Sequence, residues 1–517
     1  MASCTNLPPQ ARSISSKTEA DDHLGKGPTF AVSRVGSKED SLHTPARLAF
    51  NSYVFWSFFL VVIGLYRLLP HRSQNRMLLV ASYLFYGAWD ARFLLLIALS
   101  TAVDFLVAQR ITATSEKNIA KRWCTLSIAV NLGLLGVFKY YDFFVESFAG
   151  LLSSLFGYEA NLLSLGIILP VGISFYTFQT LSYTIDVYRG HTKPARDLLD
   201  FALYVSFFPQ LVAGPIERSH RLLPQIVEPR KNREGDFAAG LYLVIAGLFA
   251  KVVIADNMAF VCNGIFAAPA DQIGGLDRLV GIYAFAFQIY GDFYGYSSIA
   301  RGISRWMGID LMANFHMPYF ARSPSDFWSR WHISLSSWLR DYLYIPLGGN
   351  RGSKLFTYRN LMLTMLLGGL WHGAGWTFVL WGLYHGLLLC AYRPFESRIR
   401  LSKPSIIRRL IGTFVFFNLV CLGWLFFRAE SIAQVGIFLR EIFTNFHPTV
   451  LTAYGLKMLL FFAGPFLLFE IWLSRRNELL ALTKVRWGWR AAAYTYAVYM
   501  LLIYQPLRSS EFIYFQF

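Results

Sequence analysis

Long apolar stretches recur along the chain from Ala49 onward, separated by short polar segments. Most of them approach the roughly 17–25 residues that a helix needs to cross a bilayer. They lie near residues 53–69, 77–89, 93–109, 124–145, 161–180, 200–214, 238–256, 279–299, 361–390, 411–427, 457–473 and 491–507. A helix satisfies its own backbone amides inside lipid, whereas β-barrel strands would alternate polar and apolar residues, a pattern this chain lacks. We therefore predict an all-α polytopic membrane protein with about 10–13 transmembrane or re-entrant helices.

The segment from about residue 302 to residue 358 breaks this pattern. It is polar and is punctuated by Pro318, Pro324 and Pro346, yet it is rich in Trp, Tyr and Phe. Aromatic and basic side chains together are typical of an interfacial or re-entrant element packed on a helix bundle. We assign residues 315–358 to such an element.

One helix is expected inside this element. Ser325 precedes an acidic first turn and is a suitable N-cap. The helix should continue to about Tyr344 and end before Pro346. Three polar residues recur at a spacing of four and would share one face of it: His332, Ser336 and Arg340.

The first 48 residues differ from the rest of the chain. They are rich in Ser, Lys, Asp, Pro and Gly and show no apolar periodicity, which predicts a disordered polar tail before a membrane domain at residues 49–517. No short apolar core follows the early charges, so we do not expect a signal peptide. Ala2 stands where N-myristoylation requires glycine.

Composition agrees with a membrane protein, since 55% of the residues are hydrophobic and 15% are charged, against about 25% charged in soluble domains. The net charge of +17 raises nucleic-acid binding as a rival interpretation. The basic residues form no single stripe, however, and fall in short clusters between apolar runs, near residues 110–122, 218–233, 393–409 and 475–490. Cytoplasmic loops of membrane proteins are basic in this way, so we expect membrane lipid as a partner and no nucleic acid.

Motifs for common cofactors are absent from the sequence. The five cysteines are scattered and form no C-x-x-C pair, so neither a disulfide framework nor a zinc site is predicted. The chain contains no P-loop, Rossmann fingerprint, G-x-S-x-G elbow or H-E-x-x-H motif. We predict no bound metal and no resident cofactor.

His372 is the foremost candidate for chemistry. It lies among glycines near the middle of an apolar run bounded by Asn360 and Arg393. A charged side chain at membrane depth costs about 2.5–3.5 kcal/mol, and a neutral imidazole costs less. A neutral imidazole is what a general base requires, and the glycines would allow close helix packing or a narrow substrate path. From the residues alone, a catalytic base and a histidine that merely hydrogen-bonds between helices both remain open.

Two further histidines rank below it. His332 lies close in sequence to Arg340 and Asp341, and its alternative interpretation is a structural interfacial histidine. His385 follows His372 by thirteen residues, about 220° around a continuous helix, so it should face elsewhere unless the glycines unwind the segment.

Isolated charges also occur in or beside apolar runs. Asp292 needs a partner, and Arg301 or Arg305 is the expected one. Lys139 and Lys251 lie near the ends of predicted spans, where such side chains reach toward the interface, so we expect both to be structural.

Several motifs resemble the membrane-bound O-acyltransferase family, and within it the membrane subunits of bacterial alginate O-acetyltransferases. Residues 328–336 are Trp-Ser-Arg-Trp-His-Ile-Ser-Leu-Ser, and residues 369–374 are Gly-Leu-Trp-His-Gly-Ala. The closing residues 512–517, Phe-Ile-Tyr-Phe-Gln-Phe, belong to the same likeness, which extends over nearly all of residues 49–517.

The resemblance implies a fold of many helices around a central tunnel, with the family's essential histidine at His372 and its second recurrent histidine at His332. We expect these two to be catalytic and a further set to bind substrate: Trp331, Ser336, Arg340, Asp341, Trp371 and Asp292. The resemblance also implies acetyl transfer from cytoplasmic acetyl-CoA to an exported polysaccharide such as alginate, in a bacterial inner membrane. An extracytoplasmic acyltransferase partner often completes that transfer.

Two other hypotheses stay open at this point. A D-alanyl carrier donor or a lipid acceptor would keep the enzyme class and change the substrates. A proton-coupled transporter would share the hydropathy and the buried His and Asp. It would leave the aromatic and basic segment at 315–345 unexplained, and the chain shows no visible internal repeat.

Overall fold

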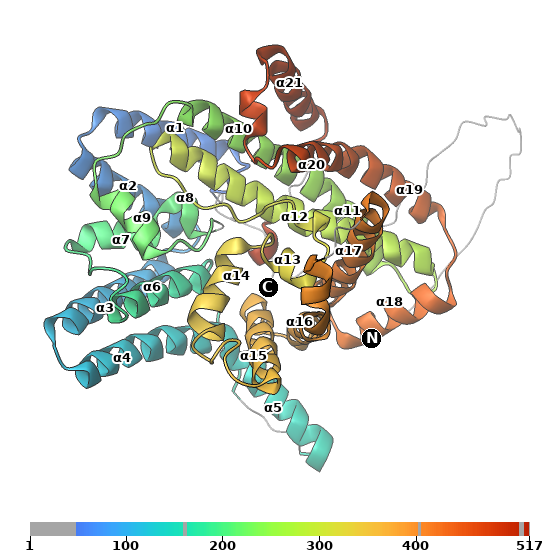
Figure 1. The fold of residues 1–517 in the computed structure, drawn as a ribbon, viewed down its shortest axis with the longest axis horizontal. Helices are drawn as coiled ribbons and strands as arrows, with labels where there is room; N and C mark the ends of the chain where they lie inside the picture. Colours follow the sequence, from blue (N-terminus) through green and yellow to red (C-terminus); the bar gives the residue numbers. More distant parts are fainter. Residues whose placement is uncertain (1–47, 159–162, 213, 402–404, 506–510, 516–517) are drawn as a thin grey trace, which may run out of the picture. The chain divides into compact units, whose positions relative to one another are not determined.

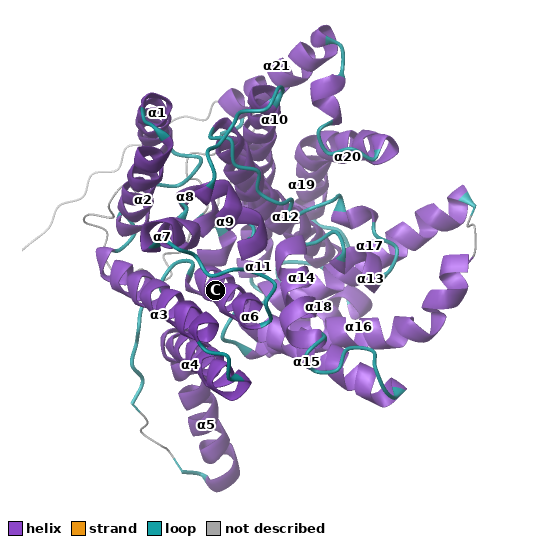
Figure 2. Cartoon of the chain, turned by 60° about the vertical axis from the view of Figure 1, so that its left-hand side comes forward, coloured by secondary structure: helices purple, strands orange, loops and turns teal. Residues whose placement is uncertain are grey.

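Helices make up all the regular secondary structure of the described residues, as Figure 2 shows. The computed structural model describes residues 48–158, 163–212, 214–401, 405–505 and 511–515. One compact unit spans Pro45–Phe517. The all-α prediction is confirmed, while the predicted polar tail lies outside the described residues except for Leu48.

The first helices form a group held together by buried polar contacts. In chain order they are α1 (Tyr53–Leu68), α2 (His71–Gly87), η1 (Ala91–Phe93), α3 (Leu94–Ala113), α4 (Lys117–Leu135), η2 (Gly136–Tyr140), α5 (Tyr141–Phe156) and α6 (Ile173–Tyr188). Asp104 on α3 accepts hydrogen bonds from Ser127 and Asn131 on α4 and from Thr184 on α6. A buried carboxylate is tolerated where neighbours hydrogen-bond it, so this cluster fixes three helices to one another.

The middle of the chain builds the central helix of the unit. Its elements are α7 (Leu198–Ser206), α8 (Phe208–Leu211), α9 (Ser219–Val227), α10 (Asp236–Leu248), the π-helical η3 (Phe249–Ala255), α11 (Asp256–Ala267) and α12 (Gly275–Trp306). Figure 1 shows α12 running through the centre of the unit with α10 beside it. A Cβ added to Gly247 would lie 2.6 Å from the carbonyl oxygen of Gly295, and the reverse distance is 2.8 Å. The two backbones approach this closely because both positions lack side chains.

The interfacial segment differs from the single helix predicted for it. It contains η4 (Pro318–Phe320), α13 (Pro324–Trp328), α14 (Ile333–Leu339) and the π-helical η5 (Arg340–Tyr344). The N-cap is Ser323, whose hydroxyl oxygen accepts from the Asp326 N–H at 3.1 Å, so Ser325 lies inside the helix. The helix ends at Trp328, and the left-handed backbone of His332, with φ of 42°, separates it from α14. The predicted continuous helix to Tyr344 is therefore wrong, and His332 does not share a helical face with Ser336 and Arg340.

The C-terminal part contains a second departure from prediction. Its elements are α15 (Lys354–His372), α16 (Trp376–Leu401), α17 (Ile406–Arg428), α18 (Ile432–Thr444), α19 (Val450–Met458), η6 (Leu459–Ala463), α20 (Gly464–Arg476), η7 (Ala481–Lys484), α21 (Trp487–Ile503) and η8 (Ile513–Phe515). The predicted span at 361–390 is a helical hairpin, because the chain turns at Gly373–Gly375 between α15 and α16. The hairpin is tight: a Cβ at Gly369 would meet the Phe378 carbonyl oxygen.

Several helices satisfy the requirements for crossing a membrane. Five helical stretches of the described chain are long and apolar enough: Ala91–Ala113, Lys117–Phe156, Asp236–Ala267, Ile406–Arg428 and Val450–Arg476. Tyr53–Leu68 is a shorter apolar helix. The remaining predicted spans fall on shorter or less apolar helices, among them α12, α15 and α16, which carry the candidate site. The protein is a multi-pass membrane protein.

Candidate active site

His372 is the last residue of α15, at the turn of the α15–α16 hairpin. A Cβ on the next residue, Gly373, would collide with the ring of Phe378. The carbonyl oxygens of Trp371 and His372 lie at the open end of the helix, where no intrahelical donor reaches them. Lys139 Nζ donates to both, at 2.7 and 3.2 Å respectively. A glycine and a lysine from another helix thus fix the backbone that carries His372.

The imidazole of His372 is held in an aromatic cage. It is 4% exposed. The ring centroids of four neighbours lie 5.0 to 5.7 Å from its own: Trp371, Trp381, Phe427 and Tyr514. Its Nδ1 has no hydrogen-bond partner among the described residues. Packing therefore orients the ring and leaves the Nδ1 atom available to hydrogen-bond a substrate.

His332 lies directly behind this cage. It is fully buried, with its ring centroid 6.4 Å from that of His372 and 4.6 Å from that of Phe293. A left-handed conformation costs a non-glycine residue about 1–2 kcal/mol. Two backbone hydrogen bonds hold it, from Ile333 N–H to the Asn314 carbonyl and from Ser336 N–H to the His332 carbonyl, both 2.9 Å. Strain of this kind is often found at functional sites.

Two cavities meet at His372. The first, which we call the Lys139 cavity, has a volume of about 60 Å³ and is lined by Lys139, the 169–175 segment, Trp371, His372 and Tyr514. The second, the Arg340 cavity, has a volume of about 200 Å³ and is mostly apolar. It extends along α14 and α15 past Ser336, Leu339 and Gly368 to Arg340 and Tyr344. Among the described residues, His372 alone lines both, so it stands where a group entering from either side would arrive.

The predicted residues on α14 and η5 divide between cavity and surface. Ser336 and Arg340 both line the Arg340 cavity. The Arg340 side chain is 64% exposed and its Nε donates to Asp341 at 2.7 Å. Asp341 also pairs with Arg218 at 3.5 Å. Arg340, Asp341 and Arg218 therefore form a charged rim at the exposed end of the cavity.

The two predicted tryptophans differ in position. Trp371 lines the Lys139 cavity and contacts both histidines, with centroids 5.0 Å from His372 and 6.0 Å from His332. Trp331 is buried in an aromatic cluster, 4.8 Å from Trp424, and does not line either cavity. Its carbonyl oxygen accepts from the Ser336 hydroxyl at 3.0 Å, so it supports the cavity wall indirectly.

The ion-pair partner of Asp292 differs from the one that the sequence suggested. Its partner is Lys251 at 2.8 Å, and neither Arg301 nor Arg305 pairs with it. Lys251 is fully buried and also pairs with Asp256 at 2.8 Å, so the expectation that it reaches toward the interface is wrong. The Ile513 N–H donates to Asp292 at 2.6 Å, which ties η8 to α12. Asp292 thus anchors the segment that carries Tyr514 and lines neither cavity.

Sequence reasoning missed other residues of the site. One is Lys139, which holds the backbone of His372 and lines the cavity beside it; a cation inside an apolar run is the signal that marks it. Tyr514 belongs to the closing aromatic motif, whose place beside His372 depends on tertiary packing. His385 is buried against Trp381, at 4.8 Å, and lines neither cavity. In the part of the chain that the structure describes, no three His, Cys, Asp or Glu side chains are grouped to hold a metal ion.

Several known proteins are similar to this chain in sequence, among them two that match about three quarters of its length. A model of the membrane-bound O-acyltransferase family matches residues 195–433. The probable alginate O-acetylase AlgI of Azotobacter vinelandii is 46% identical over 388 residues, which cover 74% of this chain and 76% of that protein. The peptidoglycan O-acetyltransferase of Helicobacter pylori is 38% identical over 422 residues, covering 74% and 78%. The teichoic acid D-alanyltransferase of Bacillus subtilis is 29% identical over 276 residues, covering 50% and 69%.

Proposed function

Because the chain belongs to the membrane-bound O-acyltransferase family and is an O-acyltransferase, we propose that it transfers an acetyl group from cytoplasmic acetyl-CoA to hydroxyl groups of an exported polysaccharide. The observation that carries this proposal is the position of His372 on the walls of two separate cavities. An enzyme with its donor and acceptor on opposite sides of a membrane needs a base that both can reach.

The Arg340 cavity suits the donor. Its apolar wall would accept the uncharged arm that carries the thioester. At its rim, Arg340 and Arg218 both contact Asp341, and Arg189 Nη1 donates to the Asp341 carbonyl oxygen at 3.3 Å. Guanidinium groups bind phosphate through several hydrogen bonds at once, so this rim suits the phosphates of coenzyme A. A basic rim is also expected on the cytoplasmic side.

The Lys139 cavity suits the acceptor, which is a sugar hydroxyl or a hydroxyl of a partner protein. His372 would remove the hydroxyl proton as the oxygen attacks the thioester carbonyl carbon. The carbon–sulfur bond then breaks, the new ester forms, and the imidazolium returns the proton to the departing thiolate. Lys139 keeps the His372 backbone in place. His332 lies on neither cavity wall, so we assign it a positioning role behind Trp371 and His372.

The names of the relatives support a polysaccharide acceptor, and we propose a bacterial inner-membrane location because these relatives come from bacteria. Two relatives are named for acetyl transfer to alginate or peptidoglycan at 46% and 38% identity. The D-alanyltransferase relative is more distant and covers half of this chain, so D-alanyl transfer is the weaker alternative. A lipid acceptor and a proton-coupled transporter gain no support from these comparisons.

Purified protein in lipid nanodiscs with radiolabelled acetyl-CoA provides the test. We expect thiol release and transfer of label to an oligosaccharide of alginate or peptidoglycan, and both must be absent in a His372→Ala variant of equal purity. Label transfer from D-alanyl carrier protein but not from acetyl-CoA would overturn the proposed donor. Equal turnover by the variant would overturn the proposed base.

A further inference from the structure

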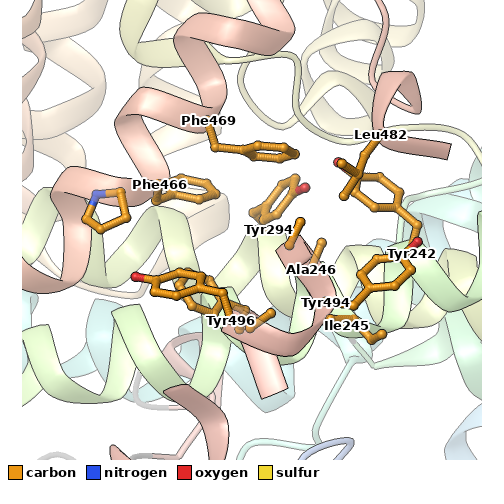
Figure 3. A pocket seen from close by; sticks show the side chains of 13 residues that line it. Tyr242, Ile245, Ala246, Tyr294, Phe466, Phe469, Leu482, Tyr494 and Tyr496 are labelled. Carbon is orange, nitrogen blue, oxygen red and sulfur yellow. The ribbon is translucent and has the colours of Figure 1, made fainter. Parts of the chain in front are cut away.

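A third cavity lies away from the candidate active site. It has a volume of about 180 Å³ and shares no residue with the two cavities at His372. Its walls come from α10 and η3, from α12, from α20, and from η7 and α21. Figure 3 shows the rings of Phe466 and Phe469 from α20 around Tyr294, with Tyr242, Tyr494 and Tyr496 completing the wall. We call it the aromatic pocket.

The aromatic pocket lies between apolar helices. Two of its walls belong to the stretches Asp236–Ala267 and Val450–Arg476, which are long and apolar enough to cross a membrane. Its lining is almost wholly apolar, apart from tyrosine hydroxyl groups.

The fourth wall, α21, has little contact with the rest of the protein. Met500 is its one buried residue in the described chain. Interior packing elsewhere in proteins leaves few voids larger than a water molecule. A pocket of this size between α21 and its neighbours is therefore able to hold an apolar ligand, and membrane lipid is the apolar molecule that surrounds these helices.

The connection from α20 to α21 supplies a complementary charge. Residues 475–490 contain Arg475, Arg476, Lys484, Arg486 and Arg490 and one acidic residue, Glu478. Lys484 pairs with Glu478 at 2.5 Å, and Arg490 Nη1 donates to the Thr483 carbonyl at 3.0 Å. Arg475, Arg476 and Arg486 are exposed and have no carboxylate partner among the described residues.

The same connection has the features of a membrane surface. Trp487 and Trp489 are 79% and 74% exposed. Exposed tryptophans beside arginines mark the lipid–water interface, and a basic connection marks its cytoplasmic side. Leu482 within this connection and Tyr494 on α21 both line the aromatic pocket. The pocket is therefore next to a basic interfacial surface.

We infer that the aromatic pocket binds one acyl chain of an anionic glycerophospholipid from the cytoplasmic leaflet, with its phosphate beside Arg475 and Arg486. Basic pockets between transmembrane helices bind such headgroups. The lipid would fill the space between α21 and the neighbouring helices and hold that helix in place. This site is separate from the proposed transfer reaction and does not depend on it.

The test uses the full-length protein in a mild detergent, with phosphatidylglycerol and phosphatidylcholine as probes. Ala497 lines the pocket, and Ala497→Trp would occupy it. Ala492 lies exposed on the same helix and does not line the pocket, so Ala492→Trp is a matched control. Native mass spectrometry should show phosphatidylglycerol retained by the wild type and by Ala492→Trp, and lost from Ala497→Trp. Added phosphatidylglycerol should raise the Tm of the first two more than phosphatidylcholine does.

A charge variant covers the case in which Ala497→Trp does not fold. Arg475→Ala combined with Arg486→Ala leaves the pocket intact, and it should abolish the preference for phosphatidylglycerol over phosphatidylcholine. Equal retention of the two lipids by the wild type would overturn the inference. So would unchanged phosphatidylglycerol binding by either pocket or charge variant, or a detergent molecule as the sole retained ligand.

Discussion

Lys139 and His372, which are 233 residues apart in sequence, meet at the end of α15, where Lys139 Nζ donates to the His372 carbonyl oxygen at 3.2 Å. The lysine also donates to the Trp371 carbonyl oxygen at 2.7 Å. One cation at membrane depth thus satisfies two backbone acceptors that the helix leaves open. It joins the α4–α5 helix to the α15–α16 hairpin and thereby fixes two of the walls of the Lys139 cavity relative to each other.

His372→Ala should remove the catalytic base and lower kcat by about 10²–10⁴-fold. The measurement is acetyl transfer by purified protein at equal loading. His385→Asn is the control, because His385 is also buried but lines neither cavity. Comparable losses in both variants would indicate a general packing effect instead of catalysis.

Lys139→Met should lower kcat while leaving KM for the donor nearly unchanged. The variant keeps most of the side-chain length and leaves two buried carbonyl groups without their donor, at a cost of about 1–3 kcal/mol. Lys139→Arg, which retains a donor, should recover part of the activity. Steady-state kinetics measure kcat and KM for the wild type, Lys139→Met and Lys139→Arg. A wild-type kcat in Lys139→Met would refute the positioning role.

Arg340→Ala should raise KM for acetyl-CoA by about tenfold or more, since a hydrogen bond to a charged group contributes about 1.5–3 kcal/mol. The value of kcat should change little, because Arg340 lines the far end of its cavity from His372. Arg359→Ala is a matched control on α15, as Arg359 does not line the cavity. An Arg340→Ala enzyme with unchanged KM would place the donor phosphates elsewhere.

Gly373→Ala should destabilise the protein by about 1–3 kcal/mol, the usual cost of overpacking. Its Cβ would collide with the Phe378 ring, although the backbone φ of −157° suits any residue. Gly375→Ala is the control, because its Cβ would lie at an ordinary 3.5 Å from the same ring. Thermal unfolding in detergent measures the difference, and equal Tm values would contradict the steric argument.

Asp292→Ala should destabilise the protein by about 3–5 kcal/mol, because it breaks a buried ion pair with Lys251. It also removes the acceptor of the Ile513 N–H, so Tyr514 should lose its fixed place beside His372. Asp292→Asn keeps an acceptor and should be milder. Thermal unfolding and KM are measured together: a raised KM without lost stability would instead support the substrate-binding role predicted from sequence.

The sequence predicted those parts of the fold that depend on local pattern. Apolar runs marked the helices, and the Leu-Trp-His-Gly motif led to His372. The left-handed turn at His332 was not predictable, because it is held by a hydrogen bond from the Ile333 N–H to the Asn314 carbonyl, a contact that no local pattern marks. For the same reason Lys251 was missed as the partner of Asp292: the two residues lie on different helices, and burial of a full ion pair has no local signature.

The π-helical segments have a consequence for insertions and deletions. Lys139 lies in η2, Lys251 in η3 and Arg340 in η5. Each such segment accommodates an extra residue in a helical turn. Deleting one residue there would restore regular winding and leave the rest of the helix in register, whereas a deletion elsewhere in the same helix would rotate everything beyond it by about 100°. Single-residue deletions in these three segments should therefore spare the fold and act mainly by moving the basic side chain that the wide turn presents.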